Sequence, residues 1–352
     1  MEFKDTPDPV SQEGRTEKSK THRPRVMILT PVYNEEGNLP FFEREVTEIL
    51  LLRPDYDFRV LFIDDGSVDR SWPIIQEICA RNSRFRGIRM SKNFGSHVAL
   101  SAGFLNGSGD AFATLACDLQ DPPEVILEFL EKWSAGARIV SGRRLTREDD
   151  IWRIVASRVF DWVLRRYTSL GVSNFTTGSF LLVDRQVAEC LRQFNEQHRV
   201  TFALVAWTGF TQVVVDYNRR PRVRGVTGWT FRKMVKTMYD AFIGFSEVPI
   251  RLMKFAGIGL FLISMIFSVH LVILWLTGDP VRGWPSLMFA LTMFFGIQFS
   301  LMGIMGEYLY RIYSEVVKRP LFIISEETGA GWGWDGESAE ASSARADNHS
   351  VN

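Results

Sequence analysis

Two long apolar runs in the C-terminal third of the chain constrain its fold most. Residues 252–276 contain only four clearly polar side chains, and residues 285–306 are similarly apolar. Each run reaches the roughly 20 residues that a helix needs to cross about 30 Å of hydrocarbon. Two buried core helices are the alternative, but consecutive helices that are apolar all round are unusual in a soluble domain. The sequence therefore predicts a transmembrane hairpin with helices at 252–276 and 285–306.

Basic residues around the hairpin predict its orientation. Arg251 and Lys254 lie at its start, and Arg311, Lys318 and Arg319 follow its end, whereas the link "TGDPVRGW" holds one Arg and one Asp. By the positive-inside rule both flanks face the cytoplasm and the link faces outward. The large N-terminal part of the chain is then cytoplasmic, beside a lipid bilayer.

The segments outside the hairpin divide the chain further. Residues 1–24 are polar without periodicity, which predicts a disordered leader rather than a signal peptide. Residues 226–251 mix basic and aromatic residues at helical spacing, which favours juxtamembrane amphipathic helices in the membrane interface, with packing on the soluble domain as the alternative. Residues 311–352 form a cytoplasmic tail, largely disordered after 325.

Strand-like and helix-like stretches alternate through residues 25–225, the predicted cytoplasmic domain. The expected strands are "RVMILT", "RVLFID", "FRGIRMS", "AFATLAC" and "ARIVSG". Amphipathic stretches separate them, around 40–52, 72–82, 97–105 and 124–134. This order predicts an α/β domain with a mostly parallel, helix-covered sheet.

Polar clusters follow three of these strands: "PVYNEE", "DDGSVD" and "DLQD". In an open α/β sheet such clusters converge on the crevice beyond the strand ends, where ligands bind. Asp118 and Gln120 could hold a hard cation there. The alternatives are an Asp-Gly turn in the second cluster and helix capping by Asp121 in the third.

Several functional classes are disfavoured by what the sequence lacks. Its 41 basic and 41 acidic residues give no overall charge that would attract nucleic acid. It contains no Gly-x-Gly-x-x-Gly after the first strand and no P-loop motif. Its three cysteines and five histidines show no zinc or disulfide spacing. An acid-lined crevice instead suits a sugar nucleotide held through a divalent ion.

Six motifs carry a resemblance to a known family: "LTPVYNEEGNLP", "LFIDDGSVDRS", "SKNFGSHVALSAGF", "CDLQDPPE", "GSFLLVDR" and "GEYLYRIYSEVVKRPLFII". Together they resemble the family 2 glycosyltransferases, and among these the polyprenyl-phosphate glycosyltransferases, such as dolichyl-phosphate mannose synthases and bacterial undecaprenyl-phosphate glucosyltransferases. The resemblance covers about residues 25–325 and implies a GT-A (Rossmann-like) nucleotide-sugar domain.

The resemblance implies a role for each matching position. The nucleotide-binding positions are Pro31, Tyr33, Glu35, Asp64 and Asp65. The metal ligands, for Mg²⁺ or Mn²⁺, are Asp118 and Gln120. The catalytic positions are Asp118, Arg143, Arg144, Arg219 and Arg222. Arginine suits phosphate because its planar fork stays charged and pairs in a bidentate manner.

Three departures from the family pattern concern charge. Ala116 replaces the first acid of the usual Asp-x-Asp-Leu-Gln, and Gly228 replaces the lysine of Gly-x-Ser-Lys. The stretch "TTGSF" at 176–180 lacks the acid that many members carry. These departures bear on metal affinity and on any catalytic acid, and leave the fold unaffected.

The implied reaction transfers a hexose from a nucleotide sugar to undecaprenyl phosphate at the cytoplasmic face of a bacterial inner membrane, with inversion. UDP-glucose is the first choice of donor, with GDP-mannose, UDP-N-acetylglucosamine and UDP-galactose open. A phosphate acceptor is largely dianionic at pH 7, so no general base is required. The alternatives are a processive polysaccharide synthase, disfavoured because the chain has no Gln-x-x-Arg-Trp, and a non-catalytic membrane scaffold. The resemblance is also compatible with a homo-oligomer.

Overall fold

The fold was analysed in a computed structural model of the chain. It describes residues 23–145, 178–220 without 195 and 198, 283–329, and scattered positions between 253 and 277. The predicted leader up to residue 22, the juxtamembrane segment 226–251 and the tail beyond residue 329 lie outside the described residues.

Within the described residues, eight strands form one sheet in the order β7-β5-β6-β4-β1-β2-β3-β8. The strands are β1 Arg25–Val32, β2 Asp57–Asp64, β3 Phe85–Met90, β4 Ala111–Thr114, β5 Ile139–Arg144, β6 Leu181–Asp184, β7 Gln212–Tyr217 and β8 Ile324–Thr328. The five strands expected from the sequence are all present, although β4 ends at Thr114, three residues earlier than its apolar run.

Parallel pairing is confined to the centre of the sheet and to one edge. Strands β4, β1, β2 and β3 pair in parallel, as do β5 and β7. Strand β6 runs antiparallel to both β4 and β5, and β8 runs antiparallel to β3. The predicted α/β domain is confirmed, with antiparallel strands that the alternating pattern did not reveal.

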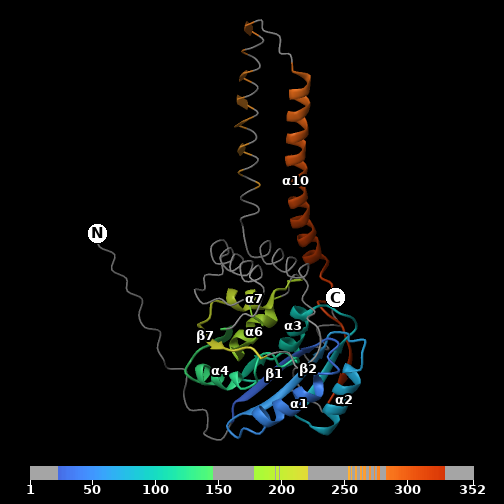
Figure 1. Cartoon of the computed structure of the whole chain (residues 1–352), viewed down its shortest axis with the longest axis vertical. Helices are drawn as coiled ribbons and strands as arrows, with labels where there is room; N and C mark the ends of the chain where they lie inside the picture. Colours follow the sequence, from blue (N-terminus) through green and yellow to red (C-terminus); the bar gives the residue numbers. More distant parts are fainter. Residues whose placement is uncertain are drawn as a thin grey trace, which may run out of the picture.

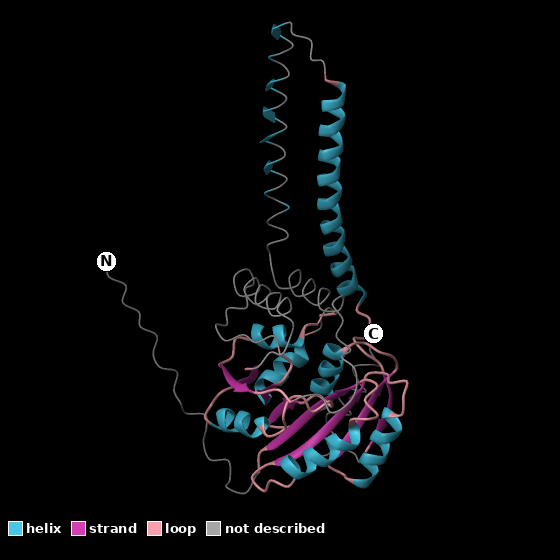
Figure 2. Ribbon diagram, in the orientation of Figure 1, coloured by secondary structure: helices cyan, strands magenta, loops and turns pink. Residues whose placement is uncertain are grey.

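Helices cover both faces of the sheet (Figure 1). They are α1 Leu39–Val46, continued by a π-helical turn Thr47–Leu51, then α2 Ser71–Arg81, α3 Ser96–Asn106, α4 Val125–Ser134, α6 Arg185–Gln193 and α7 Thr201–Trp207. Helices α1, α2 and α4 share one buried cluster, and α3, α6 and α7 share the other. The strands therefore lie between two helical layers (Figure 2).

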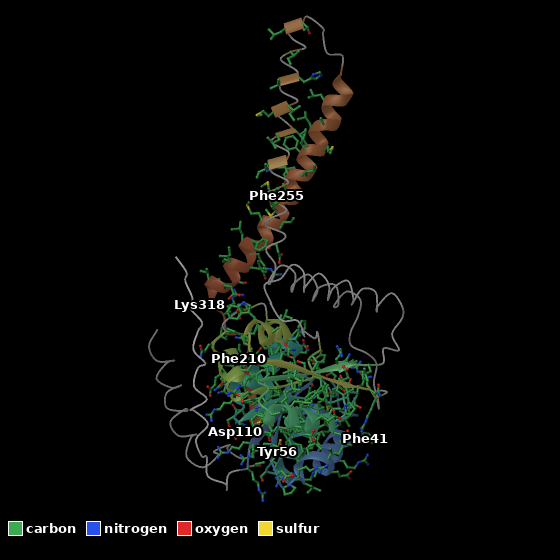
Figure 3. All side chains as sticks on the ribbon, turned by 90° about the vertical axis from the view of Figure 1, so that its left-hand side faces the viewer. Phe41, Tyr56, Asp110, Phe210, Phe255 and Lys318 are labelled. Atoms are coloured by element: carbon green, nitrogen blue, oxygen red, sulfur yellow. The ribbon has the colours of Figure 1, made fainter. Side chains whose placement is uncertain are left out.

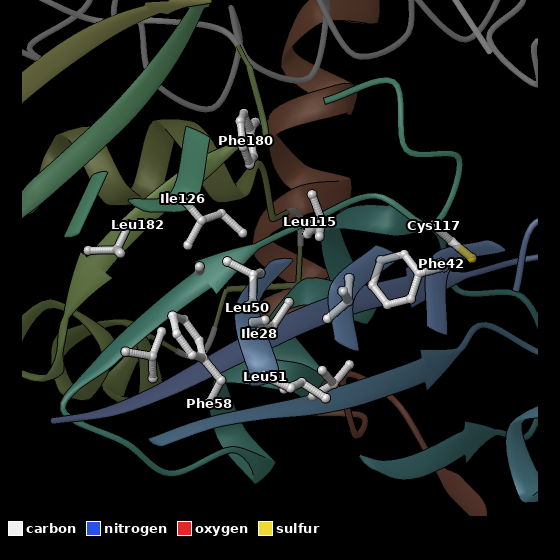
Figure 4. Close-up of a cluster of buried hydrophobic side chains, with 14 of the residues drawn as sticks. Ile28, Phe42, Leu50, Leu51, Phe58, Leu115, Cys117, Ile126, Phe180 and Leu182 are labelled. Carbon is white, nitrogen blue, oxygen red and sulfur yellow. The ribbon is translucent and has the colours of Figure 1, made fainter. Parts of the chain in front are cut away.

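Successive side chains of β1 point to opposite faces of the sheet and pack in the two buried clusters in turn. Val26 and Ile28 belong to the cluster under α1, α2 and α4, and Met27 and Leu29 to the other. Figure 4 shows Ile28 in the first cluster, among side chains from β2 and α1. A strand buried on both faces is apolar at every position, which explains the continuous run "VMIL".

The predicted transmembrane hairpin is not found. Among the residues that the structure describes, no helix is both long and apolar enough to cross a membrane, and on this finding that part of the predicted fold class is wrong. A span needs about 20 uninterrupted apolar residues. Only scattered positions of 252–276 are described, and 285–306 lies within a longer helix, α10 Trp284–Val317, whose last turns carry Glu307, Arg311 and Glu315.

Helix α10 extends away from the sheet domain (Figure 1). It ends where Lys318 adopts a left-handed conformation (φ 50°), just before Arg319 and Pro320. Figure 3 places Lys318 at the domain end of this helix. The chain then returns to the sheet as β8, so the end of α10 is tied to the domain through a strand.

Candidate active site

The carboxyl ends of β1, β2 and β4 place the three polar clusters side by side. Val32 pairs with Asp64 across β1 and β2, and Leu29 pairs with Thr114 across β1 and β4. The segments after these strands, 33–36, 65–71 and 115–121, therefore leave the sheet at one edge. The convergence expected from the sequence is confirmed.

Hydrogen bonds join the first two clusters. The Asn34 amide donates to Ser67 Oγ (3.0 Å), and the Val68 amide returns a bond to Asn34 Oδ1 (3.0 Å). The Glu35 amide donates to Ser71 Oγ at 2.8 Å. These bonds hold two turns from distant parts of the sequence together as one surface.

The nucleotide-binding positions predicted in the first cluster differ in exposure. Tyr33 is 45% exposed, so its ring is available to a ligand, whereas Pro31 is half-buried in β1. The carboxylate of Glu35 accepts from Asn38 Nδ2 at 2.5 Å. Glu35 thereby also contributes to the start of α1.

Asp64 is a fully buried carboxylate at the end of β2. Its Oδ1 accepts from the Ser67 amide at 3.1 Å, and Arg89 Nε lies 3.2 Å from Oδ2. Oδ2 has no hydrogen bond of good geometry within the described part of the chain. Burial raises the pKa of Asp64, and the Ser67 bonds and the charge of Arg89 oppose that rise. A buried acceptor of this kind suits a ligand N–H or O–H.

Asp65 has a structural task that the sequence did not reveal. Its two carboxylate oxygens accept from the amides of Phe94 (2.7 Å) and Gly95 (2.9 Å), which precede α3. Burial raises the pKa of Asp65 to about 6, against the lowering by these two bonds. Asp65 therefore anchors the turn into α3, and its role in nucleotide binding, implied by the resemblance, stays a prediction.

Gly66 fixes the distance between the same two loops. Its φ is +69°, and a Cβ there would lie 2.5 Å from the carbonyl carbon of Lys92. Only glycine combines this backbone conformation with so close an approach. The 64–67 turn therefore packs directly on the segment that leads to α3.

The third cluster contains the predicted metal ligands. Asp118 is 7% exposed, and one of its oxygens accepts from the Gln120 amide at 3.3 Å. Leu119 between them has a positive φ of 53°. The described residues contain no group of three or more His, Cys, Asp or Glu side chains that could hold a metal ion. One carboxylate and one amide suit a divalent cation only if the diphosphate supplies the remaining ligands.

Asp121 is the centre of a charged cluster and not a helix cap. Its Oδ1 accepts from the Tyr217 hydroxyl at 2.6 Å and lies 3.6 Å from Arg144 Nη2 and 3.7 Å from Arg219 Nε. Helix α4 begins four residues later at Val125, with no side-chain cap. The capping interpretation of Asp121 is therefore wrong.

Arg144 and Arg219 bring two positive charges to the loop that carries Asp118. Burial lowers the pKa of Arg219, as does the neighbouring Arg144, and the charges of Asp121 and Asp118 oppose that effect. The guanidinium groups of Arg144 and Arg219 therefore share a single carboxylate, that of Asp121. Such a cluster can accept a further anion.

The other predicted arginines are not in this cluster. Arg143 forms an exposed bidentate pair with Asp216, at 2.6 and 2.8 Å. It does not reach Asp121 as Arg144 does, because successive side chains of β5 point to opposite faces. Arg222 lies outside the described residues.

Arg220 belongs to the site region, and the sequence analysis missed it. Its amide donates to the Gln120 carbonyl at 2.8 Å, and its guanidinium pairs with Glu45 (2.9 Å) and Glu124 (2.6 Å). It thereby joins the end of β7 to the loop of Asp118 and to α1. In the sequence, only its position next to Arg219 indicated that Arg220 could lie near the site.

In sequence, the chain is similar to known glycosyltransferases. The model of the family "Glycosyl transferase family 2" matches residues 27–192. An uncharacterised glycosyltransferase of Synechocystis is 34% identical over 86% of this chain and 95% of its own length. A prophage-derived bactoprenol glucosyl transferase of Shigella flexneri is 32% identical over 86% of this chain and 98% of its own. Among solved structures, mannosyl-3-phosphoglycerate synthase from Rubrobacter xylanophilus aligns with a TM-score of 0.45 and 15% identity over 62% of this chain and 71% of its own.

Proposed function

The chain belongs to glycosyltransferase family 2 and is a nucleotide-sugar-dependent glycosyltransferase; from this premise we propose that it transfers a hexose to a polyprenyl phosphate. Glucose from UDP-glucose is the first choice, and undecaprenyl phosphate is the acceptor. One observation carries the proposal: a buried acceptor at Asp64 and an arginine pair at Arg144 and Arg219 lie along one edge of the sheet.

We place the nucleotide sugar along this edge of the sheet, between Asp64 and the arginine pair. Oδ2 of Asp64 would accept a hydrogen bond from the base or ribose, beside the exposed ring of Tyr33. Arg144 and Arg219 would pair with the diphosphate. Asp118 and Gln120 would hold Mg²⁺ or Mn²⁺, which supplies positive charge to the diphosphate when bound.

The proposed reaction needs charge stabilisation rather than proton transfer. An oxygen of the lipid phosphate attacks the anomeric carbon, the bond from that carbon to the diphosphate oxygen breaks, and the configuration inverts. Since the acceptor is already largely dianionic, no side chain must remove a proton. Arg144 and Arg219 stabilise the negative charge that grows on the departing diphosphate.

Two observations support a lipid acceptor and a location beside a membrane, which we propose to be the cytoplasmic face of a bacterial inner membrane. Relatives named as bactoprenol glucosyl transferases align over nearly their whole length. Helix α10 also exposes large apolar side chains, including Met293, Phe295 and Phe299. Exposed apolar surface of this kind typically marks an interaction with a lipid or a partner.

Sugar transfer by the purified protein tests the proposal. The chain is incubated with undecaprenyl phosphate and radiolabelled UDP-glucose, GDP-mannose, UDP-N-acetylglucosamine or UDP-galactose, and lipid-linked label is extracted. We expect label from one donor, a sharp loss in Asp118→Asn, and wild-type transfer in Asp55→Asn, which changes an exposed turn. No transfer from any donor would favour a non-catalytic scaffold, and growing sugar chains would favour a processive synthase.

Metal titration tests the proposed sharing of ligands. With Ala116 in place of an acid, affinity for Mn²⁺ should be weak in the free protein and should rise when UDP is added, and by linkage Mn²⁺ should tighten UDP equally. Ala116→Asp should tighten Mn²⁺ binding without nucleotide. Equal Mn²⁺ affinity with and without UDP in the wild type would contradict the proposal that the diphosphate completes the site.

A further inference from the structure

The C-terminal strand β8 lies beside the proposed nucleotide site. It pairs antiparallel with β3, and Glu326 lies opposite Arg89, with Glu327 opposite Ile88. Strand β3 in turn pairs with β2, whose last residue is Asp64. A segment about 260 residues away in sequence is therefore two strands from the buried carboxylate.

Glu326 holds two side chains at once. Its Oε2 accepts from the indole N–H of Trp72 at 2.8 Å, and its Oε1 pairs with Arg89 Nη1 at 2.8 Å. The bonds from Trp72 and Arg89 lower the pKa of Glu326. The carboxylate is thus bound on both oxygens although nearly half of its side chain is exposed.

Arg89 connects Glu326 to the turn after β2. Its Nε lies 3.2 Å from Asp64 Oδ2, and its Nη2 donates to the Ser67 carbonyl at 3.1 Å. Its guanidinium also lies over the ring of Trp72, 5.8 Å from the ring centroid. Every nitrogen of this planar group has a contact, so its position is determined by Glu326 on one side and by the 64–67 turn on the other.

We infer that Arg89 is a positioning residue for nucleotide binding, and that β8 keeps it in place through Glu326. This inference rests on the proposed function and deepens it. Arg89 contacts the Asp64 carboxylate, which would accept a hydrogen bond from the nucleotide. A shift of the Arg89 guanidinium would therefore remove a positive charge from beside Asp64 and alter the shape of the 64–67 turn. The role lies in binding and not in the chemical step.

Chain geometry provides a matched control. Glu327 is the next residue of β8 and also pairs with an arginine of β3, Arg86, and its side chain is 51% exposed against 46% for Glu326. Its partner is therefore Arg86 and not Arg89, the arginine that contacts Asp64. Glu326→Gln and Glu327→Gln therefore remove the same charge from the same strand at similar exposure.

Calorimetric binding of UDP and GDP, with donor kinetics, tests the inference. Glu326→Gln should weaken binding of the preferred nucleotide about fivefold, the effect of losing one partly exposed ion pair. Donor KM should rise similarly with kcat unchanged, because the interaction is made equally in ground and transition states. Arg89→Lys should show the same pattern, and Glu327→Gln should bind like wild type. Equal losses in the two glutamine variants, or none in Glu326→Gln, would overturn the inference.

Hydrogen exchange of the Ser67 amide gives a readout that needs no nucleotide. That amide donates to Asp64 Oδ1, so we expect about fivefold faster exchange in Glu326→Gln and wild-type exchange in Glu327→Gln. Unchanged Ser67 exchange in Glu326→Gln would overturn the positioning role even if the wild type transfers sugar. If the wild type failed to transfer sugar while Ser67 exchange rose in Glu326→Gln and not in Glu327→Gln, only the proposed function would be overturned.

Discussion

The pKa of Asp65 predicts an unusual dependence of stability on pH. Burial raises that pKa from its ordinary value of 3.8 to about 6. The folded state therefore binds a proton more tightly at this site than the unfolded state does. The contribution of Asp65 to stability is fully present below about pH 3.8 and is lost as pH rises through about 6.

The size of the effect follows from the shift. A shift of about two pKa units at 1.36 kcal/mol each corresponds to about 3 kcal/mol in all. Roughly 2 kcal/mol of this falls between pH 4 and pH 7, because the carboxyl group of the unfolded chain is already partly ionised at pH 4. Asp65→Asn removes the titration, while the loss of one acceptor for the Phe94 or Gly95 amide adds a cost that does not depend on pH. The free energy of unfolding of wild type minus that of Asp65→Asn should therefore fall by roughly 2 kcal/mol from pH 4 to pH 7.

Urea titrations of both proteins at pH 4, 5, 6 and 7 measure this difference. Carboxylates with lowered pKa, such as Asp216 and Glu326, make the opposite contribution, but they are common to both proteins and cancel. Asp55→Asn in the exposed turn before β2 controls for the loss of one negative charge. A difference that stays constant or grows with pH would refute the desolvation argument.

Three further predictions concern single contacts. Tyr217→Phe removes the hydroxyl that donates a hydrogen bond to buried Asp121, so the free energy of unfolding measured by urea titration should fall by about 2 kcal/mol. An unchanged urea midpoint would contradict a stabilising hydrogen bond between the two side chains. Gly66→Ala places a Cβ 2.5 Å from the backbone at positive φ, so it should lower the free energy of unfolding by about 1–3 kcal/mol and weaken UDP binding in calorimetry. Wild-type stability in this variant would mean that the 64–67 turn and the segment before α3 separate easily. Arg143→Gln breaks an exposed pair with Asp216, so sugar transfer and the unfolding midpoint should match wild type. A large loss of turnover would show that Arg143 does belong to the active site.

The sequence by itself determined the elements of the sheet domain. The run "VMIL" in β1 is apolar at every position because the strand is buried on both faces, and that local pattern was sufficient to predict it. The acids after β1, β2 and β4 likewise indicated a shared edge, since parallel strands direct their carboxyl ends the same way. The motifs also predicted the family.

Pairing over long sequence distances was not predictable in the same way. Strand β8 is short and polar, with Glu326 and Glu327 at its centre, and it forms only because the edge of β3 offers unpaired backbone groups. The apolar run at 285–306 predicted a helix, and α10 covers it, but its continuation to Val317 and its return to the sheet were not visible.

Tertiary structure alone decided the roles of the charged side chains. Asp64 and Asp65 are adjacent in sequence, yet their carboxylates differ. Among the residues that the structure describes, Asp64 Oδ2 accepts no hydrogen bond, whereas Asp65 anchors two amides. Arg143 and Arg144 are adjacent too, yet only Arg144 reaches Asp121, because successive residues of a strand point to opposite faces. Residue type and spacing fix which charges are available, whereas the partner of each charge depends on chain segments brought together by folding.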